Sequence, residues 1–352
     1  MRGIANLVHT FTIDESSISL CVEKRLTERI VRQKMDDALR RGDTDLQNAY
    51  HRQADALYDG PERGREGEFA KMHARLFDEW GFVALFRDLL AEFPALSEAT
   101  HQVFVASAAS KQDESVDLDR KSDAADGDAE QSRGRGIGNR LTLPRFSDLD
   151  GLRRHLRHEW MHLDDMLNPE FSFTGRSPWG HLPPSEENVL RERYRAFWCA
   201  SIDGRIQQSG REPEQPRERR RAEFDKLFRK FPESWRDSVF GKLWGGPIVA
   251  HAALLSMADS REAFQAYAGV EDGDADDIAD VLPVSVGDAC PLCRFPTHDW
   301  MLTTVPADAG RGFVAGEGDV FARIHASFPN WNPNDGVCER CYERHETEAI
   351  VA

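Results

Sequence analysis

The chain has 352 residues, of which 45 are Lys or Arg and 61 are Asp or Glu, so its formal net charge is −16 at pH 7. This acidic balance argues against general binding of nucleic acid, because the phosphate backbone favours a basic protein surface. A hydrophobic content of 40% is enough to build real cores, and a chain of this length accommodates about two or three domains.

The N-terminal region, residues 1–108, is mostly helical in pattern. Apolar side chains recur at three- and four-residue spacing in four segments, residues 26–39, 46–57, 69–82 and 83–93. A strand is expected near residues 101–107. No motif in this region indicates a catalytic or binding site. The pattern also leaves open whether the region packs with the rest of the chain or forms a separate domain.

An acidic, glycine-containing segment follows at residues 109–139. It has few apolar residues to bury, which predicts a disordered linker or a mobile flap. Gly134, Gly136 and Gly138 lack the GxGxxG spacing and a preceding strand, which argues against a nucleotide site.

A strand and a long helix are predicted next. Residues 140–144 have the pattern of a short strand, and leucines then recur at helical spacing up to Leu167. Ser147 or Asp148 can serve as the N-cap, and Asn168 followed by Pro169 ends the pattern. One helix of about 20 residues is therefore expected.

That helix carries an HExxH pentad at residues 158–162. His158 and His162 are four residues apart, so they share one helix face and can both reach a metal ion. Glu159 lies about 100° around the helix, where its carboxylate can act on a water molecule without binding the metal. The alternative is that both histidines lie on the helix surface and that Glu159 pairs with an arginine.

A strand followed by an HExxH helix resembles the zinc metallopeptidases of the zincin class, of gluzincin or aspzincin type, over residues 140–205. Asp165 and Asn168 stand where the longer metzincin pattern has Gly and His, so the resemblance does not extend to metzincins. The resemblance implies that His158 and His162 bind a catalytic zinc ion and that Glu159 is the catalytic residue that activates water.

A third protein ligand is expected from the next helix, predicted from Ser185 to Arg205. Asp203 follows the most apolar stretch of that helix, and a carboxylate buried there is costly unless it meets a metal or an arginine. In the resembled enzymes an acid on a following helix completes the site, so we predict Asp203 as the ligand. The alternatives on the same helix are Glu186, Glu187 and Glu192.

Three further residues are candidates for supporting roles. Asp165 falls close to His158 on the helical wheel, so it could orient a ligand histidine or be a solvated acid. Tyr194 and His181 could stabilise a developing oxyanion. Tyr194 also fits a core position, and His181 also fits an ordinary loop.

Two CxxC pairs lie near the C-terminus, Cys290 with Cys293 and Cys338 with Cys341, with 44 residues between the inner cysteines. Two such turns can close a tetrahedral four-cysteine site, which leaves no position for water and is therefore structural. Residues 283–352 thus resemble a zinc ribbon, and the acidic residues 271–282 are interpreted as a spacer. Redox pairs and disulfides are the alternatives.

The sequence predicts a cytoplasmic protein. The N-terminus lacks an apolar core of signal-peptide length, and no stretch has the roughly 18 apolar residues of a membrane span. In a reducing compartment the two remaining cysteines, Cys21 and Cys199, are expected to be ordinary semi-buried thiols.

The whole pattern predicts an α+β, mainly helical protein with a zincin-like metallohydrolase core at residues 140–270 and a small C-terminal zinc ribbon. Two Zn²⁺ ions are expected, one catalytic and one structural. The predicted function is that of a zinc-dependent hydrolase, chiefly a metallopeptidase, acting on a peptide or protein substrate without nucleic acid or membrane. The alternative is a non-catalytic zinc-binding scaffold that binds protein partners through its ribbon and acidic linkers.

Overall fold

The computed structural model describes residues 8–13, 18–119, 135–175, 177–269, 284, 287–305, 312–329 and 331–351. It confirms a mixed α and β protein that is mainly helical. The chain forms two compact units. Unit 1 comprises residues 1–178, 198–217 and 244–254, and unit 2 comprises residues 179–197, 218–243 and 255–352.

A five-stranded sheet is the framework of unit 1. Its strands are β1 (Val8–Thr12), β2 (Ser19–Glu23), β3 (Thr100–Ser107), β4 (Ser115–Leu118) and β5 (Arg135–Leu141). The order across the sheet is β1-β2-β3-β5-β4. The three central strands run parallel to one another, and both edge strands are antiparallel to their neighbours.

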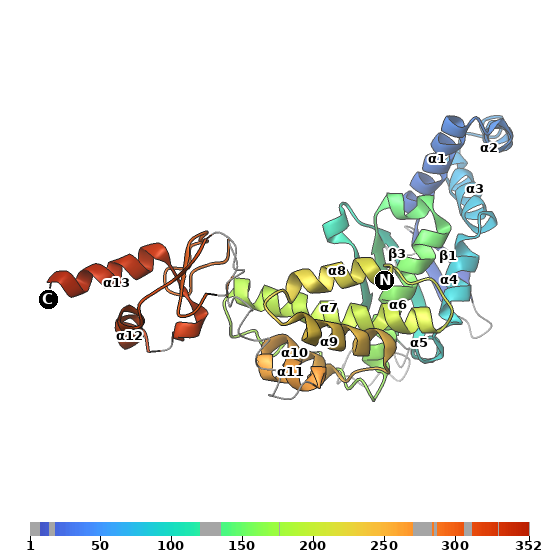
Figure 1. Cartoon of the computed structure of the whole chain (residues 1–352). Coiled ribbons are helices and arrows are strands. Elements are labelled where there is room, and N and C mark those ends of the chain that lie inside the picture. The colour runs from blue at the N-terminus through green and yellow to red at the C-terminus, as the bar shows by residue number, and fades with distance from the viewer. Residues whose placement is uncertain are drawn as a thin grey trace, which may run out of the picture. The chain divides into compact units, whose positions relative to one another are not determined.

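Three helices between β2 and β3 extend beyond one end of the sheet (Figure 1). They are α1 (Lys24–Arg41), α2 (Thr44–Tyr58) and α3 (Arg65–Glu79). Gly42 ends α1 with a φ of 70°, a left-handed conformation that glycine adopts without strain, so the chain can turn directly into α2. Val31, Met72 and Leu76 form the small core of these helices.

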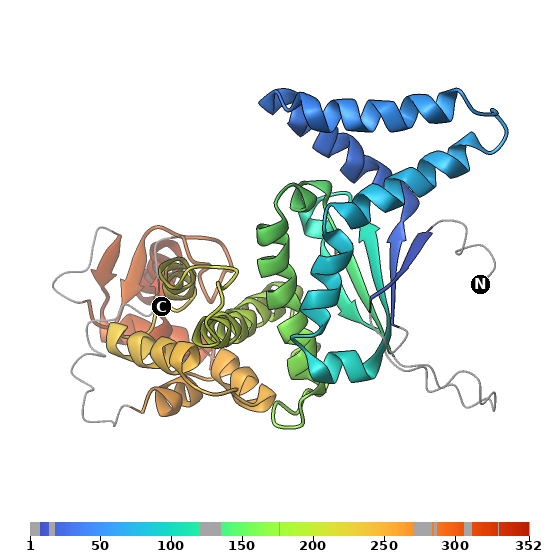
Figure 2. The ribbon, with the colours of Figure 1, turned by 90° about the vertical axis from the view of Figure 1, so that its right-hand side faces the viewer.

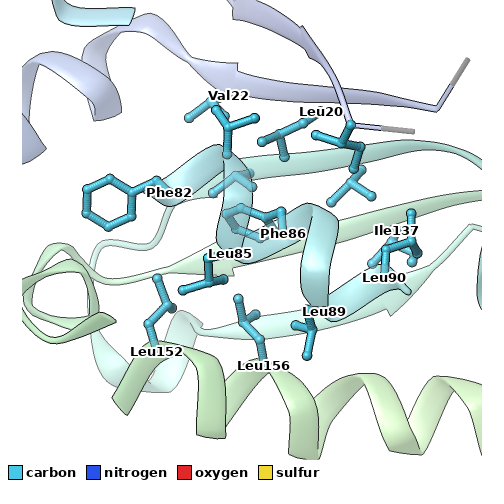
Figure 3. Close-up of a cluster of buried hydrophobic side chains, with 14 of the residues drawn as sticks. Leu20, Val22, Phe82, Leu85, Phe86, Leu89, Leu90, Ile137, Leu152 and Leu156 are labelled. Carbon is cyan, nitrogen blue, oxygen red and sulfur yellow. The ribbon is translucent and has the colours of Figure 1, made fainter. Parts of the chain in front are cut away.

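The main core lies on one side of the sheet, under α4 (Phe82–Leu90), α5 (Pro94–Ala99) and α6 (Leu149–Leu167) (Figure 2). Phe86 and Leu89 of α4 lie between the strands and Leu156 of α6 in the close-up view (Figure 3). All three side chains are fully buried. The core therefore fixes α6 against the sheet through α4.

Helix α6 begins and ends where the sequence predicted. Asp148 is its N-cap and accepts a hydrogen bond from the Asp150 amide, and Asn168 is its C-cap. Within the pentad, the Trp160 indole donates a buried hydrogen bond of 2.9 Å to Asn139 on β5. The Asn139 amide in turn donates to the Phe104 carbonyl on β3 at 3.0 Å. The HExxH segment is thus tied to β5 and, through Asn139, to β3.

The prediction of a linker at residues 109–139 is wrong at both ends of this segment, where the structure has ordered elements. Residues 111–113 form a 3-10 helix, and β4 and most of β5 are strands of the sheet. The alternation in β4, with Val116 and Leu118 half-buried, suits an edge strand, and four residues are too few for a clear sequence signal. The middle of the predicted linker, residues 120–134, lies outside the described residues.

The predicted helix from Ser185 to Arg205 is α7 (Pro184–Gln208). It is followed by α8 (Arg217–Leu227), α9 (Glu233–Gly245), α10 (His251–Asp259) and α11 (Arg261–Ala268). The helical part of unit 2 has an aromatic core. Its members are Phe197, Phe224, Phe228, Phe231, Phe240 and Phe264.

The C-terminal part of unit 2 holds a three-stranded sheet in the order β7-β6-β8, with β6 (Trp300–Leu302), β7 (Phe313–Ala315) and β8 (Val337–Cys338). Helices α12 (Gly318–Ser327) and α13 (Glu339–Val351) accompany it. The predicted spacer, residues 271–282, lies outside the described residues. Within the described parts of the chain, no helix has the length and apolar character that crossing a membrane requires.

Gly204→Ala tests the close approach of α7 to the end of α9. A Cβ at Gly204 would lie 2.1 Å from the Trp244 carbonyl oxygen, so the backbone has to move. We expect a loss of about 2 kcal/mol in the free energy of unfolding, measured by urea denaturation. Gly241→Ala, in α9 with open space around it, is the matched control and should raise stability slightly because alanine favours helix. Equal effects of the two variants would refute the packing argument.

Glu114→Gln tests the contact that ties β4 to the start of the α6 segment. Glu114 accepts hydrogen bonds from the Thr142 hydroxyl and from Arg145, at 2.6 and 2.9 Å. Burial raises the pKa of Glu114, but these hydrogen bonds outweigh burial and lower the pKa to about 2 from the usual 4.5. The carboxylate therefore stabilises the fold fully above pH 4.5, and this contribution disappears as the pH falls toward 2.

In urea titrations at several pH values, Glu114→Gln should be less stable than the wild type at pH 6 and should approach it near pH 3. Glu79→Gln removes an exposed partner of Arg75 and should leave the pH dependence unchanged. A constant difference between Glu114→Gln and the wild type across this range would contradict the assignment.

Candidate metal centre

One face of α6 carries four side chains that can bind metal or move protons. His155, His158, Glu159 and His162 recur at three- and four-residue spacing, so they form one polar stripe along the helix. Leu152, Leu156 and Leu163 are buried in the core that α6 shares with α4 and the sheet. The helix is therefore amphipathic, and its polar stripe faces away from that core.

His158, His162 and Cys199 come together at the centre of this stripe. Their ligand atoms lie within 4.8 Å of one another, and Cys199 Sγ is 3.7 Å from His162 Nε2. Cys199 comes from α7, and both it and His158 are buried. Two imidazoles and one thiolate form a donor set that binds zinc or copper.

Asp203 lies one turn after Cys199 on α7 and contacts the other side of the His158 ring. Its Oδ1 accepts a hydrogen bond of 2.8 Å from His158 Nδ1 and another of 3.2 Å from the Glu214 amide. Because an ionised carboxylate only accepts, Nδ1 carries a proton in this contact, and Nε2 is the nitrogen that can bind a metal ion once it is deprotonated. Cys199, and not Asp203, thus belongs to the group with His158 and His162, and the predicted ligand role of Asp203 stays a prediction.

His155, Glu159 and Glu214 form a second group beside the first. Their ligand atoms also lie within 4.8 Å of one another. His155 Nδ1 is 2.8 Å from Glu214 Oε1, and Glu214 Oε2 is 3.9 Å from His158 Nε2. Glu214 thus stands between the two groups.

The charges of these two groups are strongly coupled. Burial lowers the pKa of His158, but Cys199 and the hydrogen bond to Asp203 outweigh burial and raise the pKa well above its usual value. Burial raises the pKa of Glu214, yet the hydrogen bond to His155 and the nearby His158 lower it to about 2. Glu214 is therefore anionic throughout the physiological range.

Asp165 supports the site indirectly, through α7. It is buried and accepts hydrogen bonds from Trp198 Nε1 at 2.7 Å and from both terminal nitrogens of Arg205, at 2.8 and 2.6 Å. The Trp198 ring meets the His162 ring edge-on, with centroids 4.3 Å apart. Among these contacts Asp165 therefore has no hydrogen bond to His158 or His162, but it holds the Trp198 ring beside His162.

The other predicted residues lie elsewhere. Glu186, Glu187 and Glu192 are on the first half of α7 in unit 2, and none belongs to a metal-binding group among the residues that the structure describes. Glu187 pairs with Arg191 at 2.7 Å. Tyr194 packs near Trp179, and His181 is exposed in a loop of the same unit. Their predicted roles stay predictions.

Sequence reasoning missed three members of these groups, namely His155, Cys199 and Glu214. Cys199 was expected to be an ordinary thiol, but it lies beside His162. His155 precedes His158 by three residues, a spacing that places it on the pentad's face. Cys199 precedes Asp203 by four residues on α7, which places both on one face. Glu214 lies in a loop, so no periodicity could have identified it.

The four paired cysteines meet in unit 2, where their Sγ atoms lie within 4.8 Å of one another. All are free thiols, with Cys293 and Cys338 sulfurs 3.7 Å apart. The Cys338 amide donates to Cys290 Sγ and the Cys341 amide to Cys338 Sγ, both at 3.4 Å. This cluster can hold a metal ion, as the two CxxC pairs predicted.

Close packing shifts the pKa values of these thiols in both directions. Burial raises the pKa of Cys338 to about 11, and burial with the neighbouring Cys338 also raises the pKa of Cys341. Burial likewise raises the pKa of Cys293, but hydrogen bonds with the Phe295 backbone and the other cysteines outweigh burial and lower this pKa. Thiolates packed this closely repel one another unless a cation lies among them. The donor set suits a structural zinc ion.

Comparison of the chain with models of protein families, with curated proteins and with solved structures finds no match.

Proposed function

We propose that this protein is a zinc-dependent hydrolase, acting on a peptide or another amide, whose catalytic metal is held by His158, His162 and Cys199. The meeting of these three donors at the HExxH pentad supports the proposal most directly. Glu159 lies on the same face of α6, next to the donors but outside their group.

In this proposal Asp203 positions His158 and does not bind the ion itself. A carboxylate that accepts a hydrogen bond from the non-ligating nitrogen fixes the tautomer and the orientation of a ligand histidine. The hydrogen bond from His158 Nδ1 to Asp203 has this geometry. Cys199 then takes the third ligand role that the sequence had suggested for Asp203.

A zinc ion in such a site lowers the pKa of a water molecule and polarises a substrate carbonyl. Glu159 accepts a proton from the attacking water and passes it to the departing amine. Trp198, held by Asp165, limits the space beside His162. The four-cysteine cluster holds a second, structural zinc ion.

A non-catalytic scaffold is the second candidate. The side chains of His158 and Asp203 are only 2% and 0% exposed, and such burial is typical of closed, structural metal sites. Against it stands Glu159, which a structural site does not require. Only catalysis requires the Glu159 carboxylate, so substitution of this residue distinguishes the two functions.

Metal content and turnover test the hydrolase. Elemental mass spectrometry on the purified chain should find two zinc ions in the wild type, and one each in Cys199→Ser and Cys290→Ser. Glu159→Gln should keep both ions while hydrolysis of a peptide library falls by about 10²- to 10⁴-fold, because only the proton transfer is lost.

One outcome would move the conclusion to the scaffold, namely two zinc ions with no hydrolysis of any peptide by the wild type. Hydrolysis by Glu159→Gln at the wild-type rate would instead refute the role of Glu159 as the proton acceptor. A copper ion in place of the zinc at Cys199 would also contradict the hydrolase, because the same donor set suits that metal.

Asp203→Ala tests the orienting role of this carboxylate. Without it, His158 is free to change tautomer, and we expect the affinity for the ion at Cys199 to fall by about 10- to 100-fold. Competition with a chelator measures this affinity. Asp203→Asn retains an acceptor oxygen, so its affinity for the ion should fall less. If Asp203 instead bound the ion directly, both variants would lose a charged ligand and both would bind the ion poorly. The four-cysteine ion should be unaffected and serves as the internal control.

A further inference from the structure

Helix α6 presents two staggered pairs of potential ligands. His158 and His162 form one pair four residues apart, and His155 and Glu159 form another pair with the same spacing. A pair four residues apart on one helix face can bind a single ion. Each pair also receives one ionisable side chain from the segment 198–217, Cys199 for the first and Glu214 for the second.

The second trio has the features of a metal site. His155 is buried, and its Nδ1 lies 2.8 Å from Glu214 Oε1, a separation close to that of neighbouring ligands around one ion. Glu159 completes a group in which all ligand atoms lie within 4.8 Å. One imidazole and two carboxylates carry a charge of −2, which a divalent cation neutralises.

We propose that His155, Glu159 and Glu214 bind a second divalent transition-metal ion next to the ion of His158, His162 and Cys199. For Nδ1 of the neutral His155 ring to bind the cation, the ring proton must lie on Nε2, so the cation replaces the hydrogen bond to Glu214 and no net proton is released. Zinc and manganese suit this mixture of nitrogen and oxygen donors.

Glu214 makes the two neighbouring positions compatible. Its Oε1 faces His155 while its Oε2 is 3.9 Å from His158 Nε2, so one carboxylate lies between both ions and screens their repulsion. Arg145 Nη1 is 3.9 Å from the same carboxylate, but its principal partner is Glu114 at 2.9 Å. Carboxylates between paired metals place them about 3.5–4 Å apart.

The consequence for activity rests on the proposed hydrolase function. Glu159 is the proton acceptor there, and a carboxylate bound to a cation is a poor base. Occupation of the second position therefore inhibits the enzyme, so hydrolysis should fall when free zinc rises above the level that fills the first position.

The test is a zinc titration of the full chain after removal of loosely bound metal, with ions counted by native mass spectrometry and affinity measured by calorimetry. The wild type should hold two ions tightly and a third at excess zinc. Glu214→Gln and His155→Gln should each weaken the third ion by about tenfold or more, because one ligand is lost.

Glu212→Gln is the matched control. Glu212 lies two residues from Glu214 and pairs with Arg154 at 3.0 Å, but its side chain is 72% exposed. Among the described residues it belongs to no metal-binding group. This variant should bind the third ion as the wild type does. The four-cysteine ion, counted in the same spectra, reports whether each variant is folded.

The outcomes separate this inference from the proposed function. A wild type that binds two ions tightly and never a third overturns the second site and leaves the hydrolase standing. A third ion that survives both Glu214→Gln and His155→Gln at full affinity also overturns it. If no metal binds at His158, His162 and Cys199, the proposed hydrolase function is refuted. In that case a zinc ion whose binding depends on His155 and Glu214 would still support the second site.

Discussion

The two faces of α6 determine how this part of the molecule is built. One face packs under α4 against the sheet, and a buried hydrogen bond from Trp160 to Asn139 on β5 fixes the helix at the middle of the pentad. Such a bond contributes only about 1 kcal/mol, but leaving either buried partner unsatisfied costs about 1–3 kcal/mol. Rotation of α6 is therefore opposed, and its histidines are held on the opposite face.

The sequence predicted the elements that carry long periodic patterns, and missed those that depend on distant pairing. Helix α6 has a cap at Asp148, regularly spaced leucines and a stop at Asn168, so all its signals are local. Strands β1 and β4 have only five and four residues, and the pairing that brings β1 and β2 into the sheet is that of β2 with the distant β3, where Ser19 lies opposite Gln102. Local patterns could not show that β1 and β2 join the sheet next to β3.

The residues of the candidate site likewise divide into those that a local pattern reveals and those that only the folded chain brings together. The pentad and the two CxxC pairs were visible because the spacing within each of these motifs is local. Asp203 was selected because a buried carboxylate needs a partner, and it has one, the His158 ring. A projection of α7 alone could not show whether Cys199 or Asp203 would lie nearer to His162, because that depends on how two helices cross.

The loop after α7 couples the two groups on α6 mechanically. The Glu214 amide donates to Asp203, while the Glu214 carboxylate contacts His155, so one residue is connected to both. The neighbouring Glu212 pairs with Arg154 on the same helix, but its side chain is 72% exposed, so this surface pair contributes little to holding the loop. A change at Glu214 therefore acts on His158 through Asp203 as well as by charge. For this reason the change to glutamine, which removes the charge but keeps the size and shape of the side chain, separates lost charge from lost position.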